Sequence, residues 1–469
     1  DLIAAIETLF ATEEGQDRPR DGLSLNIEKT KIDSLRDAAY DGEGLSVLGS
    51  CVGTVTARRS FLKTKTEHMR VTLHRLRCIP SQQALLLLRV CIYPELLHLL
   101  RTMDTSDLTE ELKDIDNLFY NHVDYLRRSN PDVVRDPIIT RIYSLPLSQG
   151  GFGLISYEEI SPAARGAARD AAQDRLRVIL PDDNPMPTVA EENPEPKLSQ
   201  QARTRIILRE AMTAFAETLS VDQRLAFIDN SSKGGTGWLR ANPVGKYRSL
   251  TNSQIAAAIN IRSLQPAVFD RPLCAGCGGD NRMQHYEDCP HFHPCYQYRH
   301  NQVRDNIIQT IRGTSREVRS EPSMYTNNTR RADIFVGAAD GVNGPAHPQY
   351  GFLDVKVYSV FLNGDRARRQ TARDQFPEAS MKKAAWRQIA AVLDTTVMNT
   401  RASYPLPHRR PGCDQDVVPV VLSTGGTLHK EFFQLLKDLV PDAGARDALL
   451  INISIALVRA RAKAYPVAA

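Results

Sequence analysis

Residues 331–357 read RADIFVGAADGVNGPAHPQYGFLDVKV. Apolar residues alternate or run together at both ends of this stretch, which predicts a strand at each end. Asp333 starts the first strand, and Asp354 and Lys356 lie two residues apart in the second. Because residues i and i+2 of a strand point to the same face, two neighbouring strands would bring Asp333, Asp354 and Lys356 to one spot.

Strands and helices alternate around this stretch. The predicted strands cover residues 332–336, 351–360 and 417–422. The predicted helices cover residues 380–392, 428–439 and 445–462. Strands interleaved with helices indicate an α/β fold with a mixed sheet. We therefore expect residues 306–469 to form an α/β domain.

The pattern Asp-x20-Asp-x-Lys is that of the PD-(D/E)-x-K nucleases. In such a site two carboxylates, here Asp333 and Asp354, hold Mg²⁺, a lysine helps to activate water, and the water attacks a phosphodiester in line. Lys383 in the following helix is an alternative to Lys356 as the catalytic lysine, and Glu321 is a candidate additional metal ligand. The structural alternative is ordinary strand-end carboxylates with a lysine that reaches solvent.

Four of the eight cysteines lie within 22 residues, at positions 274, 277, 289 and 295. Cys274, Cys277, His285 and Cys289 form C-x2-C-x7-H-x3-C, a spacing that suits tetrahedral zinc. Four protein ligands leave no open position, so the predicted site is structural. His291, His293 and Cys295 are alternatives to the second pair of ligands.

A basic segment follows the cysteine cluster and contains Arg299, His300 and Arg304. It begins a predicted helix. A solvated helix face is one interpretation, and contact with nucleic-acid phosphates is the other.

The first two thirds of the chain have mainly helical patterns. An apolar face recurs at Leu62, Met69, Leu73 and Leu76, and again at Leu108, Leu112, Ile115 and Phe119. Further helices are predicted at residues 82–100, with a kink at Pro94, and at residues 162–176, 202–227 and 254–264. Glycines at residues 150–153 predict a fixed loop, and the Pro-rich residues 181–196 predict a linker.

Charge and composition decide less than these motifs. Lys+Arg 59 against Asp+Glu 55 gives 59 − 55 = +4, so a polyanion site must come from local clustering. Charged residues and Pro94 interrupt the most apolar run, residues 84–100, so we expect no membrane span. The chain starts at Asp1 without a secretory pattern, which we interpret as a fragment of a longer, reduced, non-secreted protein.

The order of these segments resembles that of non-LTR retrotransposon reverse transcriptases, specifically the site-specific group with a C-terminal restriction-like endonuclease. The resemblance covers nearly the full chain. It rests on Gly22-Leu23-Ser24-Leu25-Asn26 with Lys29-Thr30, Leu48-Gly49-Ser50 with Val52-Gly53, the apolar helices from residue 80 to residue 100, the loop at residues 145–154, the zinc cluster with Arg299-His300-Asn301, and Asp333 with Asp354. Ala332 stands where the family has proline.

The resemblance implies five regions. They are the end of the polymerase palm (1–45), a helical thumb (46–145), a helical linker region (146–265), the zinc knuckle (266–305) and the endonuclease (306–469). It also implies a protein of the nucleus, or of the cytoplasm before import, that binds target DNA and element RNA or an RNA–DNA hybrid. No membrane or small-molecule cofactor is implied. The nuclease would nick DNA, and the exposed 3′ hydroxyl would prime copying of the RNA.

A polymerase also needs paired aspartates in a palm turn. Asp182-Asp183 lies in the Pro-rich segment instead, so we expect the palm upstream of residue 1 and no polymerisation by this chain. The alternative function is a catalytically inactive, domesticated or degenerate nucleic-acid-binding scaffold.

Overall fold

The computed structural model describes residues 44–179, 198–245, 247–265, 273–274, 276–279, 285–287, 289–314, 316–326, 331–339, 351–361, 381–405 and 416–465. The chain divides into two compact units, Asp1–Arg58 and Arg59–Ala469. The predicted palm strand at residues 23–27 and the Pro-rich segment at 181–196 lie outside the described residues.

In the first unit, a β-hairpin precedes the first described helix. Strands β1 (Leu45–Val47) and β2 (Ser50–Val52) pair antiparallel. Leu48 and Gly49 between them both have positive φ, 49° and 79°, as a two-residue hairpin turn of type I′ requires. Helix α2 (Val55–Leu76) starts at the end of this unit.

The second unit begins with helices, as the sequence predicts. They are α2, α3 (Ser81–Leu87), the π-helical η1 (Leu88–Ile92), the 3-10 helix η2 (Tyr93–Leu96), α4 (Leu99–Thr102), α5 (Thr109–Leu126), α6 (Pro137–Ser144), the 3-10 helix η3 (Leu147–Gln149), α7 (Tyr157–Ile179), α8 (Gln200–Thr218), α9 (Val221–Asn230), α10 (Lys233–Arg240) and α11 (Asn252–Arg262). The apolar faces predicted for α2 and α5 are buried, which confirms both periodicities.

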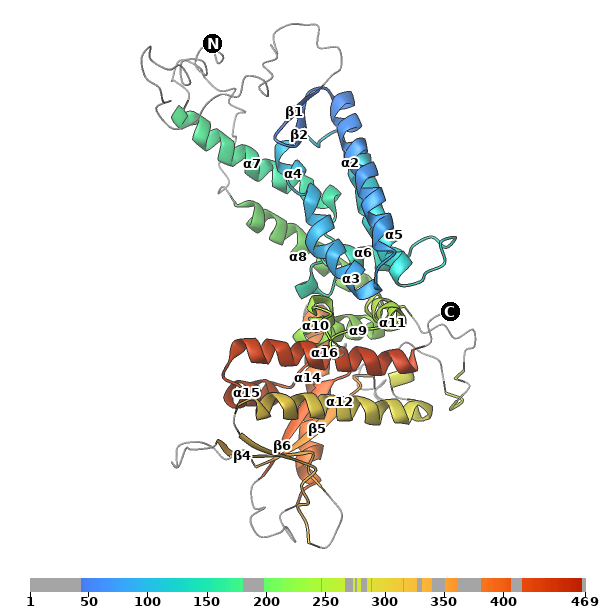
Figure 1. Cartoon of the computed structure of the whole chain (residues 1–469), viewed down its shortest axis with the longest axis vertical. Helices are drawn as coiled ribbons and strands as arrows, with labels where there is room; N and C mark the ends of the chain where they lie inside the picture. The colour runs from blue at the N-terminus through green and yellow to red at the C-terminus, as the bar shows by residue number, and fades with distance from the viewer. Residues whose placement is uncertain are drawn as a thin grey trace. The chain divides into compact units, whose positions relative to one another are not determined.

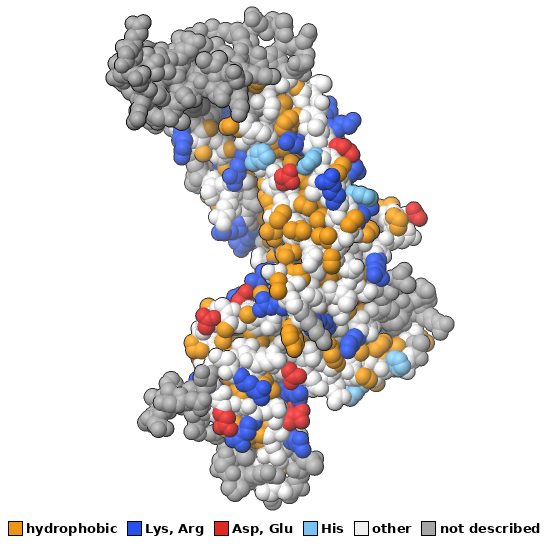
Figure 2. All heavy atoms as spheres, in the orientation of Figure 1, with side chains coloured by type: hydrophobic (Ala, Val, Ile, Leu, Met, Phe, Trp, Pro, Cys, Tyr) orange, Lys and Arg blue, Asp and Glu red, His pale blue; other side chains and the backbone are white. Residues whose placement is uncertain are grey.

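The apolar segment around Pro94 stays helical from Ser81 to Thr102, but its hydrogen-bond pattern changes before and at Pro94. The α-helix gives way to a π turn and a 3-10 turn because proline cannot donate the next helical hydrogen bond. Taken as one helix, Ser81–Thr102 is long and apolar enough to cross a membrane, with 44% of its window buried inside the protein. A buried core helix has the same length and composition. Figure 2 shows hydrophobic side chains gathered over the region of α3 and α4.

Helix α7 starts five residues before the predicted position at Pro162. Asp116 of α5 accepts hydrogen bonds from the Tyr157 amide at 2.8 Å and from the Ser156 hydroxyl at 2.6 Å. This partner lies 41 residues away in sequence and satisfies an amide that the first turn leaves free. Local patterning could not reveal it.

The glycine loop is fixed, as predicted. Gly150 and Gly153 have φ of 93° and 79°, and a Cβ at Gly151 would overlap the carbonyl oxygen of Leu145. Two arginines, half-buried Arg89 and buried Arg262, hold the loop by its carbonyls: Arg89 Nε donates to Phe152 at 2.7 Å and Arg262 Nη2 to Gly151 at 2.9 Å. Burial lowers the pKa of Arg262 to about 9.

The last part of the chain contains a four-stranded sheet. Its order is β3 (Arg316–Ser320), β4 (Ile334–Ala339), β5 (Phe352–Tyr358) and β6 (Val417–Ser423). Only β5 and β6 are parallel, so the sheet is mixed, as predicted. Strand β3 escaped prediction because its sequence, REVRS, is mostly charged.

Helices cover this sheet. They are α12 (His293–Arg312), α14 (Met381–Ala402), α15 (Lys430–Leu439) and α16 (Ala443–Ala464), and Figure 1 shows α12 beside α16. Leu353 and Val355 of β5 join one apolar core with residues of α12, α15 and α16. Because strand side chains alternate, Asp354 and Lys356 point to the other face.

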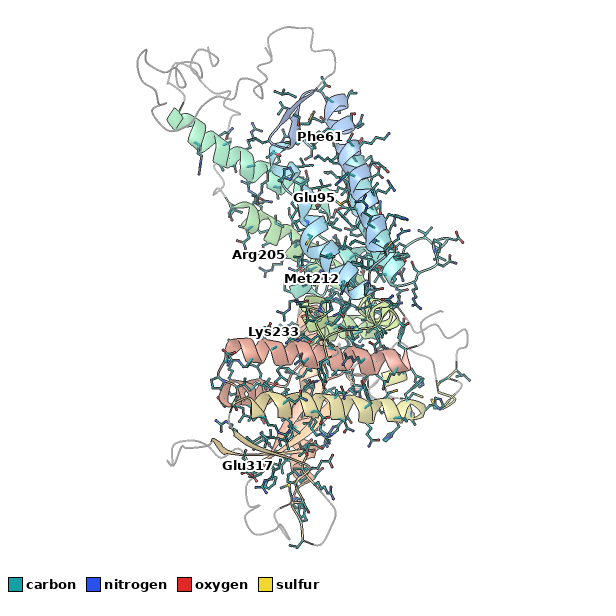
Figure 3. The ribbon with its side chains drawn as sticks, viewed as in Figure 1. Phe61, Glu95, Arg205, Met212, Lys233 and Glu317 are labelled. Atoms are coloured by element: carbon teal, nitrogen blue, oxygen red, sulfur yellow. The ribbon has the colours of Figure 1, made fainter. Side chains whose placement is uncertain are left out.

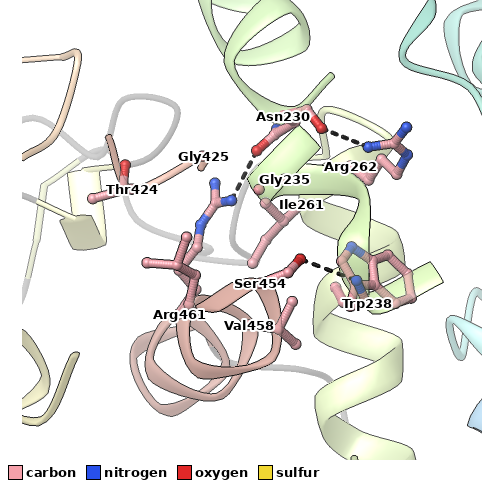
Figure 4. A pocket seen from close by; sticks show the side chains of 13 residues that line it. Asn230, Gly235, Trp238, Ile261, Arg262, Thr424, Gly425, Ser454, Val458 and Arg461 are labelled. Atoms are coloured by element: carbon pink, nitrogen blue, oxygen red, sulfur yellow. Dashed lines mark hydrogen bonds between the residues drawn. The ribbon is translucent and has the colours of Figure 1, made fainter. Parts of the chain in front are cut away.

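Buried polar contacts join the helices α9 to α11 to this sheet region. Around a cavity of about 20 Å³, Arg461 Nη1 donates to Asn230 Oδ1 at 2.8 Å, and the Trp238 amide donates to Ser454 Oγ at 3.0 Å (Figure 4). Asp229 accepts from the hydroxyls of Ser423 and Thr427. Residues predicted to lie in separate linker and nuclease regions therefore share one interior, while the five-region division itself stays a prediction.

A buried histidine in α5 predicts a pH-dependent stability. Both ring nitrogens of His122 are buried without a hydrogen-bond partner among the described residues, and burial, reinforced by Arg77, lowers its pKa to about 4. Since the unfolded chain binds this proton near pH 6.5, the stability is complete above pH 6.5 and is lost as the pH falls toward 4. The loss is on the order of 3 kcal/mol.

We expect His122→Leu to remove the part of the stability loss at low pH that comes from protonation of His122. Thermal unfolding midpoints at pH 7.5 and pH 4.5 should lie closer together in this variant than in the wild type. His74→Gln, at an exposed position of α2, should keep the wild-type difference. An equal difference in His122→Leu and the wild type would contradict the assignment.

Candidate functional site

The sheet brings Asp333, Asp354 and Lys356 together, as the sequence predicts. Asp333 stands directly before β4, and its amide donates to the Leu353 carbonyl of β5 at 3.1 Å. The Val355 amide in turn donates to Asp333 Oδ2 at 2.6 Å. The two aspartate carboxyls interact with each other, and each contributes to the pKa shift of the other.

Without a bound cation, ionising both of these buried carboxyls costs free energy, because their negative charges repel each other. Burial, together with the Asp333 carboxyl, raises the pKa of Asp354 to about 6. Burial also acts to raise the pKa of Asp333, but hydrogen bonds from His300 and Asp354 outweigh it and lower that pKa. Lys356 Nζ lies 3.1 Å from Asp354 Oδ1 and 2.9 Å from Oδ2. Asp354 is only 2% exposed, and the contact of its Oδ2 with Lys356 Nζ is an ion pair rather than a well-aligned hydrogen bond.

Lys383 and Glu321 are the other two residues predicted for this site. Lys383 is exposed in the first turn of α14, whereas Lys356 is the lysine that pairs with Asp354. Glu321 follows β3, and its amide donates to the Asp333 carbonyl at 2.9 Å. Its carboxylate pairs with Arg304, which favours a structural role over metal binding.

The three residues of the basic segment, Arg299, His300 and Arg304, lie on α12, and each side chain contacts another part of the chain. His300 Nε2 lies 3.1 Å from Asp333 Oδ1. Arg299 is buried, with its guanidinium 5.2 Å from the Tyr296 ring centre and 3.4 Å from the Val357 carbonyl oxygen. Contact of these residues with nucleic acid stays a prediction, and the burial of Arg299 argues for a role inside the domain. The sequence pattern gave no signal of the contact between His300 and Asp333.

The predicted zinc ligands form one cluster. Their ligand atoms all lie within 4.8 Å of one another. Cys274 Sγ and Cys289 Sγ are 3.7 Å apart, and Cys277 Sγ is 3.3 Å from His285 Nε2. Two sulfurs bound at 2.3 Å to one tetrahedral ion would be about 3.8 Å apart. Cys274, Cys277, His285 and Cys289 could therefore hold a metal such as zinc.

Backbone amides donate hydrogen bonds to the first two ligands, Cys274 and Cys277. The Gly276 and Gly279 amides donate to the sulfurs of Cys274 and Cys277, each at 3.4 Å. Burial acts to raise the pKa of the Cys274 thiol, but hydrogen bonds led by the Cys277 and Gly276 amides lower the net pKa to about 6. Thiolate is the form that binds zinc. Gly278 has a φ of 70°, which glycine adopts without strain.

The alternative ligands lie outside this cluster. Among the described residues, the ligand atoms grouped within 4.8 Å are those of Cys274, Cys277, His285 and Cys289. The ring of His291 packs beside Gly276, and Cys295 packs against a small apolar core with Tyr286 and Tyr465. His293 begins α12. The structure therefore favours the original four ligands.

The Cys/His cluster is anchored to the C-terminal helix by groups that sequence patterns did not single out. Glu287, two residues after His285, pairs with Arg461 of α16 at 2.7 Å and accepts from the Thr424 hydroxyl. All three side chains are buried. A lone Glu and a lone Arg 174 residues apart carry no signal in the sequence.

No family model matches this chain, and no curated protein matches it. The geometry of the two sites is therefore the basis for a function. The first is a buried pair of carboxylates with a lysine, and the second is a set of four metal ligands. The first has the groups needed for metal-assisted chemistry, and the second has the closed set typical of structural zinc.

Proposed function

We propose that this protein binds nucleic acid and nicks DNA by Mg²⁺-dependent hydrolysis of a phosphodiester. The observation that carries the proposal is the meeting of Asp333, Asp354 and Lys356 beside β4 and β5. Convergent carboxylates of perturbed pKa next to a lysine are typical of catalytic sites.

The donor set suits a hard divalent cation. Asp354 Oδ2 is a buried carboxylate oxygen that forms an ion pair with Lys356 Nζ at 2.9 Å, and Asp333 and Asp354 repel each other when both are charged. Asp333 and Asp354 would hold Mg²⁺, which binds through one or two carboxylates and keeps several waters. The bound ion would supply polarisation of water and of a phosphoryl oxygen.

The other groups of the site orient and balance charge. His300 and the Val355 amide hold the Asp333 carboxylate by its two oxygens. Lys356, whose side chain is 42% exposed, reaches solvent beside Asp354, where its ammonium can orient a water and offset negative charge on the phosphorane-like transition state. Water attacks phosphorus, the P–O3′ bond breaks, and the leaving oxygen takes up a proton to give a free 3′ hydroxyl.

The larger context of the proposal is the C-terminal region of a retrotransposon reverse transcriptase. Supporting it is the order along the chain of helices, a Cys/His cluster and a mixed sheet with the aspartate pair. In that setting the free 3′ hydroxyl would be the primer for reverse transcription at the target site. The protein would act in the nucleus.

An inactive nucleic-acid-binding scaffold is the second candidate. The observation that favours it is the burial of Asp354, which is paired with Lys356 and only 2% exposed. In a scaffold this pair would simply balance charge within the sheet.

Incubation of the zinc-loaded protein with supercoiled plasmid tests the choice. We expect conversion to the nicked form in Mg²⁺ and none in Ca²⁺ or without added metal. Retained duplex binding with no nicking in Mg²⁺ or Mn²⁺ would support the scaffold and overturn the nuclease.

A further inference from the structure

A groove of about 630 Å³ lies away from the aspartate pair and from the zinc cluster. It is bounded by η3, α10, α15 and the first turns of α16, which come from distant parts of the sequence. Figure 3 labels Lys233 of α10 at its position near α16. None of the residues predicted from the sequence to bind nucleic acid lines this groove.

The groove is rich in cations. Lys233, Arg240, Lys437 and Arg446 line it together with a single acid, Asp447. Arg240 pairs with that acid at 3.1 Å, across the groove from α10 to α16. Two further acids, Asp442 and Asp438, do not line the groove: Asp442 caps α16 through the Ala445 amide, and Asp438 accepts from Gln434, and both keep their charge. The cations outnumber the acid by four to one.

The remaining three cations stay available to a ligand. Lys233 is exposed and pairs with no acid in the described part of the chain. Arg446 donates to the Val440 and Pro441 carbonyls at 2.6 Å, which fixes its guanidinium without neutralising its charge. Lys437 Nζ lies 4.8 Å from the ring centre of Phe433.

Aromatic and apolar surface accompanies these charges. Phe433 is 37% exposed although it is a large hydrophobic residue, and it lines the groove beside Lys437. Leucines of η3, α15 and α16 also line the groove. A free phosphate would leave this ring without a contact, whereas an unpaired base can stack on it while its phosphates meet the cations.

We propose that this groove binds single-stranded nucleic acid, with Lys233, Lys437 and Arg446 on the phosphates and Phe433 under a base. The inference rests on the proposed function for the class of partner and on the groove for the place and strandedness. Unpaired DNA at a nicked target site and the element RNA would each supply phosphates and unpaired bases.

Fluorescence anisotropy with labelled oligonucleotides tests the groove without Mg²⁺, so that binding is read independently of nicking. The probes are single-stranded DNA, RNA of the same sequence and the corresponding DNA duplex. The double variant Lys233→Ala/Lys437→Ala should weaken single-strand binding at least tenfold and reduce the slope of log K against log salt by about 1.4, because each single-strand phosphate contact contributes about 0.7. Lys430→Ala, in an exposed lysine of the same helix α15, is the matched control and should bind like the wild type.

Phe433→Ala reports the stacking. It should weaken single-strand binding about tenfold, leave the salt slope unchanged and alter duplex binding less than twofold. The tighter wild-type binding, to single-stranded DNA or to RNA, shows which nucleic acid the groove prefers.

Equal affinities of the wild type, the double variant and Phe433→Ala for single strands would overturn the inference, even if the protein nicks DNA. Competition by polyglutamate as strong as by an oligonucleotide would overturn it in favour of an acidic peptide. Groove-dependent single-strand binding without any nicking would leave the inference standing and remove only the nuclease.

Discussion

Cys277→Ser should release one equivalent of zinc and destabilise the region around residues 274–289. Serine is a much weaker zinc ligand than thiolate, and a structural ion contributes its binding free energy to folding. Because Glu287 of this region pairs with Arg461 inside the protein, we expect the effect to spread to α16. The thermal unfolding midpoint should fall by on the order of 10 °C.

Zinc content by elemental analysis and the unfolding midpoint measure both effects. Cys295→Ser is the matched control, since Cys295 lies 18 residues along the chain from Cys277 but outside the four-ligand cluster. It should keep one zinc per chain. Equal zinc content in wild type and Cys277→Ser, or loss of zinc in Cys295→Ser, would mean that the ligand set is wrong.

Asp354→Asn should abolish nicking while the protein stays folded. Asparagine keeps the shape of the side chain but removes the charge that would hold Mg²⁺, and the loss of such a charge lowers rates by about 10²–10³-fold or more. Removing the buried charge also removes its repulsion with Asp333, so the unfolding midpoint should not fall. The initial rate of plasmid nicking in Mg²⁺ is the measurement.

Two comparisons sharpen this test. Asp394→Asn, in an exposed carboxylate of α14, retains an acceptor for His429 and should nick at the wild-type rate. Lys356→Met should lower the rate about 10²-fold, whereas Lys383→Met should lower it by less than threefold. The opposite ranking of the two lysines would assign the catalytic role to Lys383. A wild-type rate in Asp354→Asn would contradict the carboxylate site.

Sequence patterns predicted those parts of the protein that depend on short-range rules. The spacing of Cys274, Cys277, His285 and Cys289 is local, and so is the two-residue period that sets Asp354 and Lys356 on one face. The pairing of β4 with β5 followed from two adjacent strand patterns.

What the sequence did not reveal depends on distant partners. The start of α7 is set by Asp116, and the interior position of Arg299 is set by the fold of α12 against β5. Strand β3 has a charged sequence and is recognisable only by its pairing with β4. Such contacts leave no period or spacing in the chain, because each partner alone is an ordinary polar residue.

Binding of Mn²⁺, followed by the loss of its free-ion electron paramagnetic resonance signal, tests the metal centre most directly. Mn²⁺ substitutes for Mg²⁺ at oxygen ligands, and the measurement needs no DNA. We expect the zinc-loaded wild type to bind one Mn²⁺ and Asp354→Asn to bind it at least tenfold more weakly with its zinc retained. Equal Mn²⁺ affinity in the two proteins would contradict a metal site between Asp333 and Asp354.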